Sequence, residues 1–298
     1  MNSCQAPDLH VLDLSENLLS GKLPNCWMYF QGLLSLNLAE NILSGKLPRS
    51  LGYLMNIISL RLHDNSFSGE FPYLENCTEL VVVDLGANKL SGKIPASAWI
   101  GQSLRNLLFL RLRSNKLNGS MHLTLCSLSI IYVLELSQNN ISGALPHCPK
   151  NITALSYELY DFTIADIFVQ LVWKGVDIEF GRSPKHLRSI HISSNHLVSE
   201  NPENLSSMTK LNSLNLSRNN LWGKLPENFG QLKTLESLSG RIPSSFSSLN
   251  FLSVLDLSYN NLSGRIPLSA QLPSFNSSQY MGNLGLCGPP VTQKCPGD

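Results

Sequence analysis

Long apolar runs are missing from this 298-residue chain, and charge is scarce. A membrane-spanning helix needs about 18 or more consecutive apolar residues. No stretch of this sequence is that long, so no bilayer span is predicted. Charged residues make up 14% of the sequence, against roughly a quarter in an average domain. The 22 Lys and Arg residues nearly balance the 21 Asp and Glu residues, which argues against general binding to phosphate backbones.

The N-terminus also lacks a secretory leader. Its first residues, MNSCQAPDLHVLDLSENLLSG, hold no basic segment followed by a continuous apolar core. Leu9, Leu12 and Leu14 already follow the repeat pattern described below. We therefore expect that this chain was cut from a longer one.

Catalytic and metal-binding motifs are missing as well. The sequence has no glycine-rich phosphate loop, no nucleophile elbow and no Cys-x-x-Cys pair. His186, His191 and His196 are spaced at five residues, which does not bring them together on a metal ion, so we expect them at the surface. The sequence predicts a non-catalytic protein without a metal or cofactor.

What the chain does contain is an asparagine-centred repeat. The second copy reads LLSLNLAENILSGKLP over residues 33–48. Six copies, 23 to 27 residues apart, close on Asn17, Asn41, Asn65, Asn88, Asn115 and Asn139, and further copies close on Asn195, Asn219 and Asn260. Self-similarity at this period predicts a leucine-rich-repeat solenoid of the α/β class, mostly β, right-handed and curved, with a parallel sheet on its concave side.

Each repeat has a physical explanation. Alternating leucines predict a short strand with Leu pointing inward and the intervening side chains pointing outward. The asparagine lies where the chain leaves this strand, and we expect its amide to bond backbone groups of neighbouring coils. Loss of one such amide should cost about 1–3 kcal/mol, because buried polar groups would lose their partners. Gly permits the bend that follows, and Pro returns the chain to the core.

The cysteines and the glycosylation acceptors indicate the compartment. The repeated 22-residue spacing and the C-terminal loop favour three disulfides: Cys4 with Cys26, Cys126 with Cys148, and Cys287 with Cys295. Cys77 has no partner in phase; the alternative for all seven cysteines is buried thiols. Disulfides indicate a secreted or cell-surface environment. Eight Asn-x-Ser/Thr acceptors are consistent with that environment: Asn76, Asn118, Asn140, Asn151, Asn204, Asn215, Asn261 and Asn276.

Two irregularities interrupt the array. Residues 149–186 form an insertion in addition to the regular repeats. Within it, expected strands at 167–173 and 176–180 around Lys174-Gly175 predict a hairpin. Its aromatic side chains argue against disorder, and we expect about half of them to pack the insertion onto the solenoid. Between Asn219 and Asn260 a repeat has lost seven residues, so we expect a bulge or misregistered turn from Leu235 to Pro243.

The segments LSGKLP (43–48), LSGKIP (90–95) and LSGRIP (262–267) resemble the plant-specific leucine-rich repeat of receptor kinases, receptor-like proteins and polygalacturonase inhibitors. LVWKGVDIEF, with HLRSIHISSNHL after it, is similar to the island of receptor-like proteins of the xylanase-receptor type, and MGNLGLCGPP is similar to their C-terminal cap. The resemblance implies repeats 1–6 at 1–148, an island at 149–186, repeats 7–10 at 187–267 with the ninth truncated, and a cap at 268–298.

That resemblance also implies a function. We expect the ectodomain part of a plant immune receptor at the outer face of the plasma membrane, which binds an extracellular protein or peptide and a co-receptor kinase. The alternatives are a truncated product without independent function and a secreted inhibitor of a fungal cell-wall-degrading enzyme. The expected ligand-facing patch combines outward strand residues with the island: Arg61, His63, Phe109, Arg111, Arg113, Tyr132, Arg188, Trp173 and Lys174.

Overall fold

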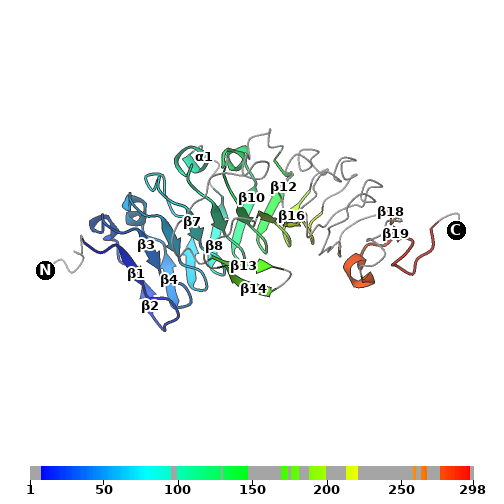
Figure 1. The fold of residues 1–298 in the computed structure, drawn as a ribbon, viewed down its shortest axis with the longest axis horizontal. Coiled ribbons are helices and arrows are strands. Elements are labelled where there is room, and N and C mark those ends of the chain that lie inside the picture. The colour runs from blue at the N-terminus through cyan, green and yellow to red at the C-terminus, as the bar shows by residue number, and fades with distance from the viewer. Residues whose placement is uncertain are drawn as a thin grey trace.

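The computed structural model describes residues 8–94, 99–128, 130–146, 169–173, 176–180, 188–198, 213–220, 258–259, 263–266 and 276–295. In this part the chain winds into stacked coils that form a curved array, as predicted (Figure 1). Seven of the described coils give one strand to each of two parallel sheets, β17 adds an eighth strand to the first sheet, and short helices lie on the far side of some coils. None of the helices described is long and apolar enough to cross a membrane.

The first sheet lines the concave side, and consecutive coils supply neighbouring strands in parallel register. Its strands are β1 (Val11–Asp13), β3 (Ser35–Asn37), β5 (Ser59–Arg61), β7 (Val82–Asp84), β9 (Phe109–Arg111), β11 (Val133–Glu135), β15 (Ser189–His191) and β17 (Ser213–Asn215). The repeat leucines point inward, and side chains such as Leu36, Leu60 and Leu110 are fully buried. The core is therefore one continuous apolar column that no single coil could bury alone.

A second parallel sheet follows the asparagine turn, and the sequence analysis did not predict it. Its strands are β2 (Ser20–Lys22), β4 (Ile42–Lys46), β6 (Ser66–Gly69), β8 (Lys89–Lys93), β10 (Lys116–Ser120), β12 (Asn140–Gly143) and β16 (His196–Leu197). Buried Leu43, Phe67 and Leu90 alternate along these strands with exposed polar residues. The Leu-Ser-Gly-Lys segment is thus itself a half-buried strand, where only a backbone bend was expected.

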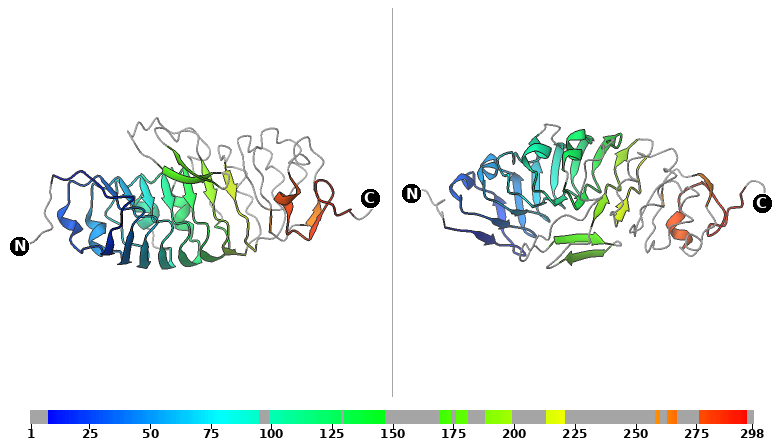
Figure 2. Two further views of the ribbon diagram at one scale, coloured as in Figure 1. Left: turned by 90° about the horizontal axis from the view of Figure 1, so that it is seen from below. Right: turned by 45° about the horizontal axis from the view of Figure 1, so that its top comes forward.

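Short elements complete the coils. They are α1 (Trp99–Ser103) and the 3-10 helices η1 (Trp27–Tyr29), η2 (Arg49–Tyr53), η3 (Leu123–Ser127) and η9 (Ser277–Tyr280). Two strands, β13 (Val169–Trp173) and β14 (Val176–Phe180), pair antiparallel where the sequence predicts a hairpin. Two views place this hairpin on the concave side of the array (Figures 1 and 2). The predicted bulge from Leu235 to Pro243 lies outside the described residues.

The consensus asparagines form the predicted ladder. Asn41 donates through Nδ2 to the Leu14 carbonyl of the preceding coil at 2.9 Å, and its Oδ1 accepts from the Leu19 amide at 2.9 Å. The same pair of inter-coil bonds recurs at Asn65, Asn88, Asn115, Asn139, Asn195 and Asn219. Each amide therefore satisfies backbone groups that the turn would leave without a partner.

Gly119 is required in the second sheet for two reasons, which a pair of variants separates. Its φ of +78° is left-handed, and an added Cβ would lie 2.9 Å from Lys93 Cγ of the preceding coil. At Gly21 the φ is +92°, but an added Cβ would meet nothing within 4 Å. We expect Gly21→Ala to cost about 1 kcal/mol of unfolding free energy through φ alone, and Gly119→Ala about 1–2 kcal/mol more through crowding. Equal losses in urea denaturation would contradict this explanation.

The C-terminal end is closed by a cross-linked strand pair. β18 (Ser263–Arg265) pairs in parallel with β19 (Gly285–Cys287). A disulfide joins Cys287 to Cys295, with Cα atoms 4.9 Å apart. Tyr280 is buried at 1% exposure beside this pair, and burial raises the pKa of its hydroxyl. Tyr280 and Leu286 of the segment predicted to be a cap thus belong to the same apolar core as the coils.

Candidate ligand-binding face

The outward side chains of the concave sheet form the candidate site, and the structure corrects their expected exposure. His63, Phe109, Arg111, Tyr132 and Arg188 were expected to face a ligand in solution, but their exposed fractions are 5%, 2%, 7%, 8% and 5%. They belong to the middle of the sheet, where these side chains are buried. Only Arg61 and Arg113 of the predicted strand residues are partly exposed.

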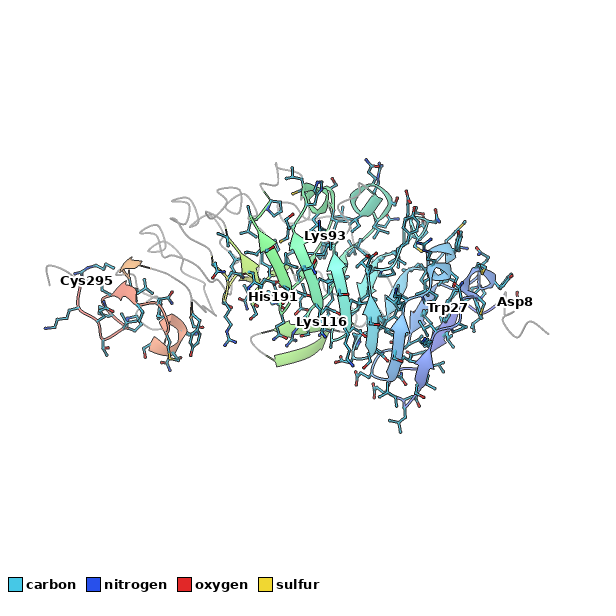
Figure 3. The ribbon with its side chains drawn as sticks, turned by 180° about the vertical axis from the view of Figure 1, so that it is seen from behind. Asp8, Trp27, Lys93, Lys116, His191 and Cys295 are labelled. Carbon is cyan, nitrogen blue, oxygen red and sulfur yellow. A yellow bond between two sulfur atoms is a disulfide. The ribbon has the colours of Figure 1, made fainter. Side chains whose placement is uncertain are left out.

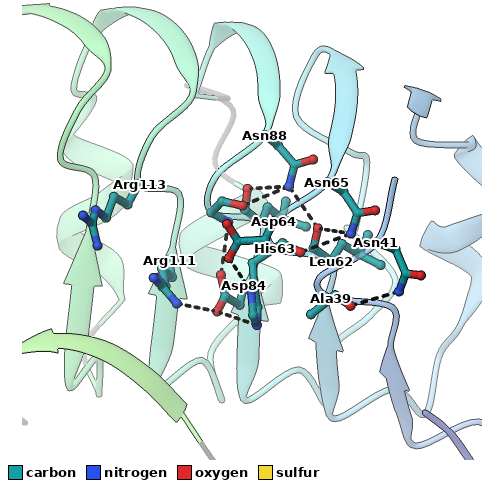
Figure 4. A network of polar contacts seen from close by, with 12 residues as sticks. Ala39, Asn41, Leu62, His63, Asp64, Asn65, Asp84, Asn88, Arg111 and Arg113 are labelled. Atoms are coloured by element: carbon teal, nitrogen blue, oxygen red, sulfur yellow. Dashed lines mark hydrogen bonds and ion pairs between the residues drawn. The ribbon is translucent and has the colours of Figure 1, made fainter. Parts of the chain in front are cut away.

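Charged side chains cross the middle of this sheet as a buried network (Figure 4). Arg111 on β9 donates from Nη1 to Asp84 Oδ2 on β7 at 3.2 Å, and its Nε lies 3.2 Å from Glu135 Oε2 on β11. Arg113 Nε is 4.0 Å from Glu135 Oε1. Carboxylates and guanidinium groups therefore alternate from strand to strand, which is the pairing that buried charge requires.

His63 extends the network toward the N-terminal coils. Its Nδ1 lies 3.0 Å from Asp64 Oδ2, and its Nε2 lies 3.8 Å from Asp84 Oδ2. The His63 hydrogen bond holds the pKa of the Asp64 carboxyl below its ordinary value. Asp84 and Glu135 therefore balance the positive charge of the arginines in the middle of this face. Asp84 was overlooked, although it occupies the repeat position of Arg61 and Arg111.

Tyr132 and Arg188 lie directly before strands β11 and β15 of adjacent coils. The Arg188 guanidinium carbon sits 4.9 Å from the centre of the Tyr132 ring, a cation–π contact between adjacent coils. Phe109 on β9 pairs in register with Val133 on β11. Trp173 ends strand β13, and its side chain and Lys174 lie outside the described residues. The structure therefore groups the predicted strand residues without testing the island residues.

The predicted surface histidines differ among themselves. His196 is exposed on β16, whereas His191 on β15 is partly buried, and His186 lies outside the described residues. Burial, together with the positive charge of Arg113, lowers the pKa of His191 to about 4. Across the described residues, no group of three His, Cys, Asp or Glu side chains could hold a metal ion.

The lowered pKa of His191 predicts an acid-sensitive stability. Between about pH 6.5 and pH 4 the unfolded chain binds a proton at this residue and the folded chain does not. Stability should therefore fall by roughly 2–3 kcal/mol as the pH drops through this window. Urea denaturation at several pH values should show the slope reduced in His191→Gln and retained in the exposed control His196→Gln. An unchanged slope in His191→Gln would contradict the assignment.

The structure describes part of the predicted disulfides and glycosylation acceptors. Cys26 and Cys126 are each in a disulfide, and their predicted partners Cys4 and Cys148 lie outside the described residues. Cys77 is a buried free thiol, and burial raises its pKa to about 12.

Five predicted glycosylation acceptors lie in the described residues. Four are exposed: Asn76, Asn118, Asn140 and Asn276. Asn215 is half-buried on β17, and Asn151, Asn204 and Asn261 lie outside the described residues.

Comparison with known proteins identifies the family. Leucine-rich-repeat family models match residues 8–30, 185–239 and 251–271. Receptor-like protein EIX2 of Solanum lycopersicum is 50% identical over 310 residues, which cover 96% of this chain. The chain belongs to the plant leucine-rich-repeat receptor-like proteins. This receptor-like chain spans 30% of the length of that relative.

Solved structures agree with the fold of this receptor-like protein. A TDR receptor matches with a TM-score of 0.68 at 28% identity, covering 87% of this chain and 40% of that one. The Arabidopsis receptor kinase HAESA, in complex with the peptide hormone IDA and the co-receptor SERK1, matches with a TM-score of 0.52 at 27% identity, covering 95% and 55%. The relatives are receptors, in agreement with the predicted non-catalytic recognition role.

Proposed function

We propose that this receptor-like chain binds an extracellular protein or peptide on its concave sheet, at the outer face of the plasma membrane. The proposal is carried by the ion-paired middle of the sheet, where Asp84, Arg111 and Glu135 fix neighbouring strands. Arg61 and Arg113 emerge partly exposed beside this block. A rigid block with adjacent arginines is suited to recognition, because little side-chain freedom is lost on binding.

A separate co-receptor kinase is the second partner that we propose. The HAESA ectodomain, which shares the fold, is known in complex with a peptide and the co-receptor SERK1. That complex supports an analogous arrangement here without identifying either partner. Signalling by this chain would then depend on ligand-induced association with the kinase.

A fungal xylanase is the first ligand to test, because the island resembles that of xylanase receptors. We expect the double variant Arg61→Ala with Arg113→Ala to weaken binding about tenfold or more in biolayer interferometry. Arg49 is exposed on η2, away from the concave sheet, so Arg49→Ala is the matched control and should bind normally. Equal binding by the double variant would contradict the proposed face.

An enzyme assay separates the two alternatives. Inhibition of a fungal polygalacturonase would favour the secreted inhibitor. A folded chain that neither binds a ligand nor inhibits the enzyme would favour the truncated product.

Glycosylation is a further part of the proposal. Asn118 on β10 and Asn140 on β12 are exposed and lie in register in the second sheet. Asn276 caps η9 through its Oδ1, which a glycan on Nδ2 leaves available. Asn215 differs, because it is half-buried on strand β17 of the concave sheet, where the side chain is less accessible for modification. Mass mapping of the secreted protein should therefore find glycans at the exposed acceptors and little at Asn215.

A further inference from the structure

The second sheet carries a concentration of positive charge that the near-neutral composition conceals. Five lysines on its strands are exposed: Lys22, Lys46, Lys89, Lys93 and Lys116. Glu70, directly after β6, is the acidic residue in the same row. Among the described residues none of these lysines has a carboxylate within 4.0 Å. The ammonium groups are therefore available to a partner.

The lysine stems are ordered by the repeat. Lys22 crosses Gly45 of the next coil, so that a Cβ added there would lie 2.8 Å from Lys22 Cγ. Lys46 crosses Gly69 and Lys93 crosses Gly119 in the same way, at 3.0 and 2.9 Å. The first carbons of these side chains thus run across the sheet on fixed tracks. Their ordering reduces the entropy that a bound anion would otherwise remove.

The lysines extend along the array, so a compact anion could not contact all of them. From β2 to β10 they cover five neighbouring strands, on the order of 19 Å at 4.8 Å a strand. Lys93 and Lys116 lie toward opposite ends of the second-sheet strands (Figure 3). A matching ligand must be an extended chain with repeated negative charges.

Serine hydroxyls between the lysines indicate what kind of chain this is. Ser44, Ser91 and Ser142 donate to the carbonyls of Gly21, Gly69 and Gly119 in the preceding coils, at 3.3, 3.5 and 3.5 Å. Their oxygens can still accept hydrogen bonds from hydroxyl groups of a ligand.

Aromatic platforms for stacked bases are missing from the same surface. The exposed positions described on strands β2 to β12 contain no aromatic side chain, whereas single-stranded nucleic acids use such platforms. We propose that the lysine-bearing face of the second sheet binds a linear polyuronate, a polysaccharide with a carboxylate and hydroxyl groups on its sugars.

The test uses de-esterified polygalacturonate and the same polymer with its carboxylates methyl-esterified. We expect the whole chain, prepared without N-glycans because the acceptor Asn118 pairs in register with Lys93, to bind only the de-esterified polymer. The affinity should fall between roughly 20 and 300 mM NaCl as charges are screened. Equal binding of the esterified polymer would overturn the proposal. Equally tight binding of inorganic polyphosphate or of anionic phospholipid vesicles would also overturn it, since the face would then recognise charge alone.

Variants locate the site on the sheet. Lys46→Gln with Lys93→Gln keeps the Cγ atoms over the glycines and should weaken binding about tenfold, whereas Glu70→Gln should strengthen it about threefold. Lys294→Gln, at an exposed lysine near the C-terminus, is the control and should bind as the unchanged chain does. Circular dichroism checks that the variants fold. Unchanged affinity in the double variant would place the site elsewhere. Arg61→Ala with Arg113→Ala on the concave sheet should leave binding of the polymer unchanged, so failure of the proposed function can be told apart from failure of this site.

Discussion

Replacing Asn115 with alanine is expected to lower the free energy of unfolding by about 2–3 kcal/mol. Its Nδ2 donates to the Leu85 carbonyl of the preceding coil at 2.9 Å and to the Leu112 and Arg113 carbonyls of its own coil at 3.2 Å. Its Oδ1 accepts from the Leu90 amide at 2.9 Å. Alanine leaves the Leu90 amide without a partner in a buried turn. The three carbonyls each lose one donor and keep another, from Asn88, Asn139 and the Ala87 amide.

Asn17 provides the matched control, because it occupies the same repeat position in the first described coil. It is exposed, and it donates only within its own coil, to Leu14 and Ser15 carbonyls. Asn17→Ala should therefore cost less than about 1 kcal/mol. Urea denaturation followed by circular dichroism measures both, and the Asn115 variant should also unfold in separate steps as coupling between coils weakens. Equal losses at the two positions would contradict the ladder.

The variant Arg111→Leu is expected to cost about 3–5 kcal/mol, because it removes the guanidinium group that two buried carboxylates share. Asp84 is 4% exposed and Glu135 is 2% exposed, and each lies 3.2 Å from a guanidinium nitrogen of Arg111. Thermal and urea denaturation measure the loss. Any binding experiment on Arg111 therefore has to separate lost stability from lost contact with a ligand.

A second substitution distinguishes burial from simple charge attraction. Adding Asp84→Leu to Arg111→Leu removes one of the two buried carboxylates that lose Arg111, so stability should recover by about 1–3 kcal/mol. The surface pair of changes Arg49→Leu with Glu70→Leu, at exposed residues, should cost less than about 1 kcal/mol. No recovery in the double variant, or a loss below about 1 kcal/mol at Arg111 alone, would show that water reaches these carboxylates.

Much of the fold could be predicted because local chemistry repeats in every coil. The spacing of Leu36, Leu38 and Asn41 specifies a strand, a turn and an amide that must find backbone partners, and the structure has all three. Such features depend on neighbours about one coil away. Because the same leucine and asparagine spacing recurs in many coils, the pattern can be recognised in a single sequence.

The second sheet was missed although its signal was present. Ser44, Gly45 and Lys46 were interpreted as a bend, but Leu43 is buried and the residues around it alternate outward as in a strand. A positive φ at Gly45 does not end the strand, because the Lys22 stem of the preceding coil occupies the space of the missing side chain. Contact across coils, rather than local propensity, decides this element.

Burial of the predicted site could not be inferred from spacing alone. The repeat position of Arg111 correctly places its side chain on the concave sheet, but exposure depends on what packs over that sheet from distant parts of the chain. Recognising Asp84 in the same row would have indicated an ion-paired interior instead of an open ligand-facing patch. A side-chain direction is local information, whereas its solvent exposure is not.

Residue-resolved hydrogen exchange by NMR tests the central claim most directly, namely that buried asparagines join the coils into one array. The amides of Leu43, Leu90, Leu117 and Ile141 donate to asparagine side chains rather than to backbone carbonyls. We predict that they are protected as strongly as the amides of the concave strands, and that Asn115→Ala removes the protection of Leu90. Exchange of these amides at the rate of an unfolded peptide would contradict the account.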